Sequence, residues 1–420
     1  MRVRSIILTS IVVATAACTG RAGVPGPREG AAAPSLEDVL ALGTADGTVI
    51  VGSSSGIVLS SSDGRVTAPD GSRLYATSRN GRSTTLEARD PSTGDVVSTT
   101  QLDGRLDIRA ASLSGDVVAL LRPLPPGVDP AYALPRTHTT IVIANPTGEE
   151  PPRRYRLRGN FEPEAFSVDD GRLFMIQYLP AEAPSSYRVT VLRLRNGAVE
   201  PVFGRFKSPP ERMPGIRLAQ VFDPASEQLY TLYTNRVAEH FHAAWQNASS
   251  GDREVSFVHV LNLRDGWAYC AGLPRSFWGQ PAEAQAMAPS PDGRSLYIVN
   301  SMRGLIAEMD THSLEITRSH RIDVGRPESG RTTATMSADG RTLYVAVGGS
   351  AISRVDVATL EIRGRWSMPG DVAGLALSDD GARLYAALRN SVAVVDTDTG
   401  DAVATLPFGS VESILHVATL

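Results

Sequence analysis

The sequence is poor in lysine, in cysteine and in long apolar runs. Lys207 is the only lysine among 41 basic residues, so arginine carries nearly all of the positive charge. The two cysteines, Cys18 and Cys270, allow one intrachain disulfide at most. Beyond the N-terminus, no run approaches the roughly 18 apolar residues that a membrane-spanning helix needs. With 42% hydrophobic and 20% charged residues, the remaining composition is typical of a soluble globular protein.

The first residues have the pattern of an export signal and not of a folded element. Residues 1–4 (MRVR) are basic, and residues 5–17 form an apolar run of 13 that is too short to span a membrane. The stretch ATAAC, which ends at Cys18, resembles a bacterial lipoprotein cleavage site, although Thr15 stands where leucine is usual. The resemblance implies that residues 1–17 are removed and that Cys18 is lipidated. Ordinary signal cleavage after Ala16 is the alternative.

The segment after Cys18 predicts a flexible tether. Residues 19–35 consist mainly of Gly, Pro, Ala and Ser, so we assign residues 18–45 to the lipidated cysteine and its spacer and residues 46–420 to the folded domain. Without residues 1–17 the chain has a net charge of 39 − 45 = −6, which argues against nucleic acid as a partner. We expect an exported monomer that is held at the extracytoplasmic side of the cell membrane by its lipid anchor alone.

One phrase recurs along the chain. It reads APSPDGRSLYIVNS at 288–301, TMSADGRTLYVAVG at 335–348 and ALSDDGARLYAALR at 376–389. An Asp-Gly turn between alternating apolar runs is a strong β-hairpin signal, because glycine adopts positive φ without steric cost. Two further strands follow each phrase, as VAVVDTDTG (392–400) and DAVATLPF (401–408) illustrate.

Weaker copies of the phrase occupy the first half of the chain. Seven turn anchors can be assigned, and their spacings run from 41 to 67 residues; they are Gly71, Gly115, Gly171, Ser226, Gly293, Gly340 and Gly381. Four antiparallel strands repeated at about this period are typical of β-propeller blades. The sequence therefore predicts an all-β propeller of four-stranded blades.

The phrase SPDGRSLYIVN resembles the YVTN-type, WD-repeat-like propeller repeats, with Tyr297-Ile298-Val299-Asn300 in place of the tetrapeptide that names them. The turns DPSTGDVV and DTDTGDAV are similar to those of quinoprotein-type propellers, but the tryptophan that docks blades in those repeats is missing. The resemblance covers about 370 residues. Because it includes lactonases, dehydrogenases, peptidases and pure binding platforms, it implies a fold and leaves the activity open.

The ends of the chain are expected to close the ring. Residues 411–420 have strand character after the last blade is complete, so we expect them to supply the innermost strand of the first blade, the one that holds Gly71. Residues 46–64 form an additional hairpin. It is either a flap on a seven-bladed ring, which we prefer, or part of a split eighth blade with the C-terminal strand.

Departures from the repeat indicate where function lies, since propeller strands are scaffold and binding residues lie mostly in loops. Three consecutive blades, the second to fourth in the seven-bladed count, carry insertions between their second and third strands, at 122–138, 178–187 and 235–254. The long inter-blade connections 204–216 and 271–284 belong to the same face. Arginine and aromatic residues are common binding anchors. The candidates on this face are Arg136, His138, Tyr178, Tyr187, His240, His242, Trp245, Arg275 and Trp278.

The sequence patterns that would point to a metal site or to a catalytic residue are weak. His240 and His242 could begin a metal site, with His138 and His259 available as further ligands, but no spacing fixes a third ligand. Ser54 lies at the centre of GSSSG, which we interpret as a hairpin turn and not as a nucleophile elbow. Cys270 falls in a fourth strand, where we expect a small buried side chain. We assign no catalytic residue, metal or cofactor.

The sequence leaves two hypotheses for the function open. The first is an envelope-anchored platform whose loop face binds a protein, a peptide or a glycan. The second is a metal-dependent propeller hydrolase, similar to the lactonases, with its ion in the central channel.

Overall fold

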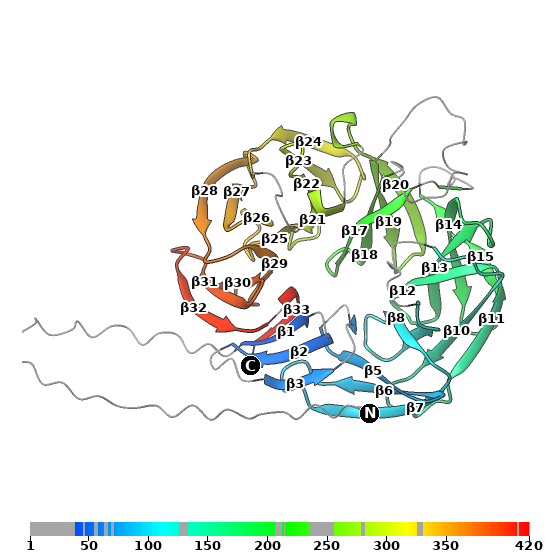
Figure 1. Ribbon diagram of the computed structural model, residues 1–420. Helices are drawn as coiled ribbons and strands as arrows, with labels where there is room; N and C mark the ends of the chain where they lie inside the picture. Colours follow the sequence, from blue (N-terminus) through cyan, green and yellow to red (C-terminus); the bar gives the residue numbers. More distant parts are fainter. Residues whose placement is uncertain are drawn as a thin grey trace, which may run out of the picture. The chain divides into compact units, whose positions relative to one another are not determined.

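The computed structural model describes residues 38–44, 47–53, 58–62, 66–68, 71–125, 133–205, 212–213, 215–234, 256–278, 282–325, 331–409 and 411–419. Within the unit that spans residues 37–420, eight antiparallel sheets are arranged around a central axis as the blades of a β-propeller (Figure 1). The all-β prediction and the four-stranded blades are confirmed. No helix in the described ranges has the length and apolarity to cross a membrane.

Each blade is named here by its order along the chain. The strands of blades 1 to 4 are β1 (Asp38–Thr44), β2 (Gly47–Gly52), β3 (Val58–Ser62) and β33 (Val411–Thr419); β4 (Val66–Thr67), β5 (Leu74–Asn80), β6 (Ser83–Arg89) and β7 (Val96–Asp103); β8 (Asp107–Ala111), β9 (Val118–Leu121), β10 (His138–Ala144) and β11 (Arg153–Arg158); and β12 (Asn160–Phe166), β13 (Arg172–Leu179), β14 (Ser186–Arg193) and β15 (Val199–Pro201).

Blades 5 to 8 follow the same plan. Their strands are β17 (Ile216–Asp223), β18 (Gln228–Thr234), β19 (Ser256–Asn262) and β20 (Trp267–Gly272), with β16 (Phe203–Gly204) added in parallel to β20; β21 (Gln285–Pro289), β22 (Ser295–Asn300), β23 (Leu305–Asp310) and β24 (Ile316–Arg321); β25 (Thr332–Met336), β26 (Thr342–Val347), β27 (Ala351–Asp356) and β28 (Glu361–Ser367); and β29 (Val372–Leu377), β30 (Arg383–Leu388), β31 (Ser391–Asp396) and β32 (Ala402–Pro407). Two short 3-10 helices, η1 (Arg275–Phe277) and η2 (Ala282–Ala284), precede blade 6.

The Ser-Xaa-Asp-Gly part of the phrase builds a self-contained turn. In blade 6, the Ser290 hydroxyl donates to Asp292 at 2.7 Å and accepts the N–H of Ser295 at 2.9 Å, while Gly293 has φ of +67°. The hydrogen bond that the Ser290 hydroxyl donates holds the pKa of the Asp292 carboxyl below its usual value. Blades 7 and 8 repeat the same serine–aspartate bond at 2.6 Å. This local bonding explains why the turn is so recognisable in the sequence.

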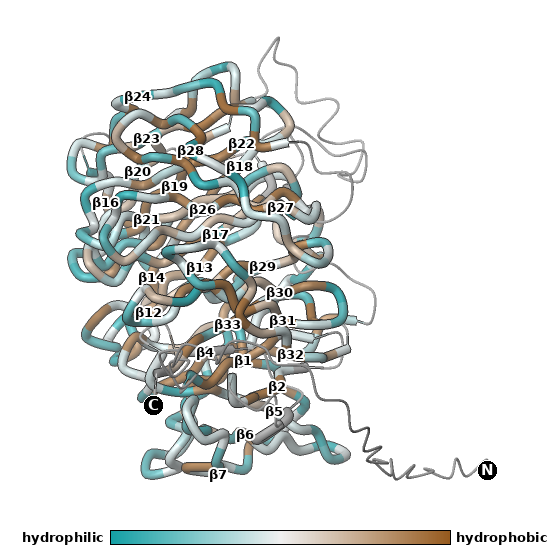
Figure 2. Tube along the Cα trace, turned by 90° about the vertical axis from the view of Figure 1, so that its left-hand side faces the viewer, coloured by the Kyte–Doolittle hydropathy of each residue, from teal (hydrophilic) through white to brown (hydrophobic). Residues whose placement is uncertain are grey.

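The Leu-Tyr part of the phrase fills the seams between blades. Side chains alternate across a strand, so neighbouring residues face neighbouring blades. Leu296 packs in the cluster that joins blade 6 to blade 5, whereas Tyr297 packs in the cluster that joins it to blade 7. Tyr344 repeats this toward blade 8. The phrase is therefore a packing unit, and Figure 2 shows brown apolar segments along the strands of the ring and teal polar segments at many of its turns.

The preferred count of seven blades is wrong, and the alternative of a split eighth blade is confirmed. Residues 38–62 form three strands in the order β3-β2-β1, and β33 joins β1 as the innermost strand. The C-terminal strand thus closes the ring, but it does so in this blade and not in the blade of Gly71, whose innermost strand is β4. The sequence analysis missed β1, because residues 38–44 had been assigned to the tether.

A buried ionic contact joins the two sides of this closure. Asp38 at the start of β1 is 2% exposed. Its carboxylate accepts a hydrogen bond from the hydroxyl of Tyr385 on β30 and lies 3.4 Å from a guanidinium nitrogen of Arg383. Both partners belong to blade 8, about 345 residues away along the chain. Blade 1 is therefore held to blade 8 by polar contacts as well as by packing.

We predict that Asp38→Ala lowers the free energy of unfolding by about 2–3 kcal/mol, because it removes the buried carboxylate that accepts from Tyr385 and faces the Arg383 charge. Urea unfolding followed by tryptophan fluorescence measures the change. Asp38→Asn is the matched control, since it keeps an oxygen acceptor and loses only the charge; it should cost less. Equal stability of the alanine variant and the parent would show that the contact does not hold the closure.

Candidate functional site

The innermost strands of three consecutive blades carry charged residues. Arg109 lies on β8, Glu162 and Glu164 lie on β12, and Arg217 lies on β17. By contrast, β21, β25 and β29 contain no charged residue. These innermost strands surround the central axis (Figure 1), and apart from Glu412 on β33 their charged residues lie in blades 3 to 5, which we call the polar sector of the ring. It is the same sector in which the sequence analysis located the loop insertions.

Glu162 is the centre of the first group of charges. One carboxylate oxygen lies 3.2 Å from Arg109 Nε, and the other accepts a hydrogen bond from Arg136 at 2.8 Å. The side chains of all three residues are between 16% and 21% exposed, so water screens these pairs less than it screens pairs on an open surface. The Glu162 carboxylate thus links Arg136, in the β9–β10 loop of blade 3, to the innermost strand of blade 4.

Glu164 forms a second group toward blade 5. It accepts a hydrogen bond from the Gln220 amide at 2.6 Å, while its other oxygen has no partner among the described residues. Burial raises the pKa of Glu164, although Arg217 acts against this shift. Burial alone would lower the pKa of Arg217, but the charge of Glu164 outweighs that effect and the pKa is raised. The group is therefore a partly satisfied polar network next to the axis.

Two loops meet above β12. The backbone N–H of Arg136 donates to the carbonyl of Ala181 at 3.0 Å, which joins the β9–β10 connection to the β13–β14 connection. The buried Asn160 amide donates to the carbonyl of Leu134 at 2.6 Å and contacts that of Ala181 at 3.4 Å. The second-to-third-strand connections of blades 3 and 4 therefore form one hydrogen-bonded surface, as their shared face predicts. The 235–254 insertion connects β18 to β19 but lies outside the described residues.

Of the predicted binding residues, Arg136 and Tyr178 lie in this polar sector. Tyr178 pairs with Asn160 across β13 and β12, and burial raises the pKa of its hydroxyl. Tyr187 has a different place. It is 2% exposed, its ring stacks on Tyr233 with centroids 4.8 Å apart, and it belongs to the core between blades 4 and 5. The stacking gives Tyr187 a packing role between these two blades, and its binding role stays a prediction.

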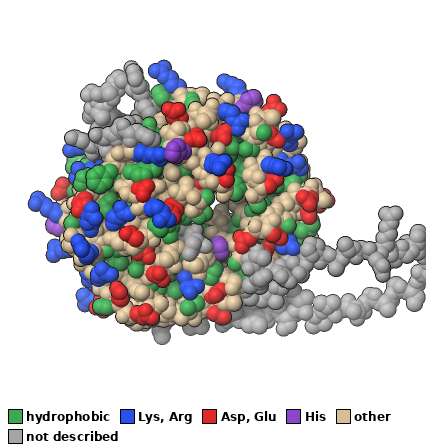
Figure 3. Space-filling model, turned by 180° about the vertical axis from the view of Figure 1, so that it is seen from behind, with side chains coloured by type: hydrophobic (Ala, Val, Ile, Leu, Met, Phe, Trp, Pro, Cys, Tyr) green, Lys and Arg blue, Asp and Glu red, His purple; other side chains and the backbone are tan. Residues whose placement is uncertain are grey.

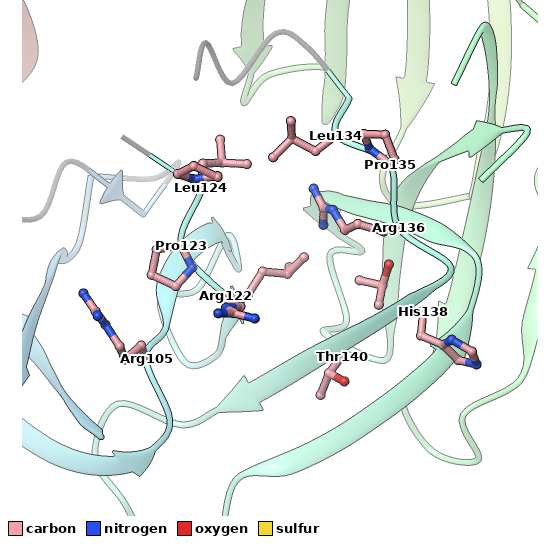
Figure 4. A pocket seen from close by; sticks show the side chains of 12 residues that line it. Arg105, Arg122, Pro123, Leu124, Leu134, Pro135, Arg136, His138 and Thr140 are labelled. Carbon is pink, nitrogen blue, oxygen red and sulfur yellow. The ribbon is translucent and has the colours of Figure 1, made fainter. Parts of the chain in front are cut away.

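The other described candidates lie apart. Trp278 donates from Nε1 to the Leu273 carbonyl at 2.8 Å, and the Arg275 guanidinium lies 5.6 Å from its ring centroid, so these two residues fasten the connection between blades 5 and 6. His138 is exposed at the start of β10. In Figure 4 its ring points away from Arg136 and Arg122.

Several candidates cannot be placed. Cys18, Ser54, His240, His242 and Trp245 lie outside the described residues.

His259 is buried on β19, with its ring edge-on to Tyr233, and burial lowers its pKa to about 4. Cys270 lies on β20, the fourth strand of its blade as expected, and its sulfur is 3.4 Å from that of Met213. Among the described residues, no three His, Cys, Asp or Glu side chains gather closely enough to share a metal ion.

A cleft of about 700 Å³ opens beside the joined loops. Apolar residues form much of its wall, and Arg105, Arg122, Arg136, His138 and two threonines add polar groups; the apolar residues are Leu121, Pro123, Leu124, Pro125, Leu134 and Pro135. Figure 4 shows the guanidinium groups of Arg105, Arg122 and Arg136 arranged around the opening. No acidic residue is among the described residues that line it.

Sequence reasoning missed Arg105, Arg109, Glu162, Glu164 and Arg217. It treated every strand as scaffold, and four of these five residues lie on innermost strands. A signal was present, since the segments LDIRAAS, NFEPEAFS and GIRLAQVF precede their turns with charges, whereas the equivalent QAMAPS, TTATMS and LALS do not. A comparison of the lead-in segments between repeats would have singled out blades 3 to 5.

Neither models of known protein families nor curated proteins match the chain. Solved structures do: one whose title is dihydro-heme d1 dehydrogenase NirN in complex with DHE superimposes with a TM-score of 0.55 at 18% identity. The similarity covers 94% of this chain and 77% of that one. At this identity the likeness shows the propeller fold alone.

We predict that Glu164→Gln raises the free energy of unfolding at pH 7. A carboxyl group whose pKa is raised in the folded state stabilises the fold only while it is protonated, and that contribution is lost as the pH rises through the raised value. Glutamine imitates the protonated form, so the gain over the parent should shrink as the pH falls toward the ordinary range of glutamate. Thermal unfolding between pH 4 and 8 follows the difference.

Glu162→Gln is the matched control on the same strand. It removes the charge that Arg109 and Arg136 share, so it should lower the free energy of unfolding by about 1 kcal/mol at pH 7. The same sign for both variants would contradict the distinction between a paired Glu162 and a desolvated Glu164.

Proposed function

We propose that the protein is an envelope-anchored binding platform, and that it holds its ligand on the loop face of blades 3 to 5. The observation that carries this proposal is the joined loop surface beside the 700 Å³ cleft. Propeller strands pack blade on blade, whereas these connections carry exposed arginine and proline and half-buried leucine, and hydrogen bonds and an ion pair fasten them to the ring. Such preorganised surfaces lose little conformational entropy on binding.

The charged residues of the innermost strands support a binding role for the same sector, blades 3 to 5. Glu162 receives Arg136 from the loop and Arg109 from β8, so the loop surface is connected to the ring by an ion pair as well as by backbone bonds. Strands β21, β25 and β29, on the other side of the axis, offer no equivalent group. A ligand that binds over blades 3 to 5 would therefore meet fixed polar groups beneath the loops.

The metal-dependent hydrolase stays the second hypothesis, but no specific observation favours it. Its ion would need several acidic or histidine ligands together, and the innermost strand of blade 4 carries two acidic residues, Glu162 and Glu164. Both are already engaged by arginine or glutamine.

Photo-crosslinking tests which face binds. We predict that a benzoylphenylalanine at Thr137 or Glu182, both exposed on the loop face, forms adducts with envelope components in living cells. The same residue at Glu149 or Asp265, exposed in turns of the opposite face, should form few. Mass spectrometry of the adducts identifies the ligand. Adducts from the opposite face alone would overturn the proposed platform.

Anchoring rests on the N-terminal pattern and has its own test. We predict that Cys18→Ser moves the protein from the membrane fraction to the soluble extracytoplasmic fraction, since a single serine cannot carry the acyl chains. Immunoblots of fractionated cells report the distribution, and globomycin should cause the uncleaved precursor to accumulate in the parent only. Continued membrane association of the serine variant would contradict a lipid anchor at this residue.

A further inference from the structure

From the cleft between β9 and β10 we infer the chemistry of the ligand: an acidic peptide segment whose carboxylates pair with Arg105 and Arg122 while its apolar side chains lie against the proline and leucine wall. This inference rests on the proposed binding function and names the class of partner that the loop face takes.

The first observation is a pair of arginines without partners. Arg105 lies in the connection between β7 and β8, and Arg122 directly follows β9; both are exposed on the loop face. Neither makes an ion pair or a side-chain hydrogen bond with any described residue. The nearby Asp107 is engaged by Arg79 at 3.1 Å. Two guanidinium groups that share one cleft repel each other, and bound carboxylates would remove that repulsion.

Arg136 lies in the same cleft but differs from these two arginines, because its guanidinium group is already paired within the protein. It donates to Glu162 at 2.8 Å and approaches the carbonyl of Phe161 at 3.4 Å, so its charge is already matched by the protein. The cleft therefore has one arginine that fixes its wall and two that are available to a ligand. A guanidinium presents two parallel N–H groups to a carboxylate, which gives a geometric preference as well as a charge preference.

The apolar wall of the cleft favours an acidic peptide over an acidic sugar. Six of the twelve lining residues are leucine or proline, and proline backbones are rigid before binding. Leucine and proline surfaces suit the aliphatic side chains of a peptide. Apart from His138, no aromatic ring is among the described lining residues, and His138 points away from the arginines in Figure 4. The stacking surface that a sugar ring would use is thus absent from this part of the wall.

The wider surface has the same sign of charge. Strand β11, the outermost strand of blade 3, carries exposed Arg153, Arg154, Arg156 and Arg158. Figure 3, which views the molecule from behind, shows many arginine side chains on the side where blades 3 and 4 lie. An acidic segment approaching blade 3 would therefore be attracted before it reaches the cleft, although the chain as a whole is acidic.

The test uses the full chain in detergent and a fluorescein-labelled hexapeptide of alternating aspartate and leucine. Its counterpart replaces each aspartate with asparagine. We expect the acidic peptide to bind at least tenfold more tightly by fluorescence anisotropy, and its affinity to fall as salt is added. The double variant Arg105→Gln/Arg122→Gln should lose at least tenfold in affinity for the acidic peptide and little for the amide peptide.

The matched control is Arg82→Gln/Arg321→Gln, which removes the same charge from exposed arginines of blades 2 and 6. It should bind the acidic peptide like the parent, and thermal melts check that both double variants are folded. Equal binding of the two peptides, equal losses in both double variants, or tighter binding of an oligogalacturonate than of the acidic peptide would overturn the inference. If loop-face crosslinks persist in the Arg105/Arg122 variant, the platform stands and only this ligand assignment fails.

Discussion

The pairing of residues 38–44 with residues 411–419 is the constraint on which the ring depends. Every other blade consists of consecutive strands, so its hydrogen bonds are local in sequence, but blade 1 takes its innermost strand from the far end of the chain. All seven residues of β1 are buried between their neighbours. Without β33 this strand would expose its inner edge, and blades 8 and 2 would each lose the surface on which they pack.

A closed ring allows polar groups to be held near its axis. The seams are filled by apolar side chains of the repeats, so the blades cannot relax toward one another when a charged side chain replaces an apolar one on an innermost strand. Blades 3 to 5 hold such charges: Glu162 pairs with two arginines, and Glu164 accepts a hydrogen bond from Gln220. The β9–β10 loop is fastened to Glu162 through Arg136, so this loop and the innermost strand of blade 4 are held together.

The sequence predicted what is local and missed what is distant. Ser290, Asp292 and Gly293 bond to one another within a single turn, so the blade repeat could be read directly. The blade count could not, because the partner of β1 lies more than 360 residues away and residues 38–44 contain no turn signal. Among the candidate residues, the sequence placed Arg136 in its loop, whereas only the fold shows that Tyr187 is stacked on Tyr233 and buried.

The split blade also orders the assembly of the protein in time. A chain that emerges from a ribosome or crosses a membrane from its N-terminus presents β1 first and β33 last. Seven blades can be completed in turn, but the buried face of β1 stays open until residues 411–419 arrive. The ring is then sealed in a single final step, and a chain that lacks these residues would keep an unpaired strand edge.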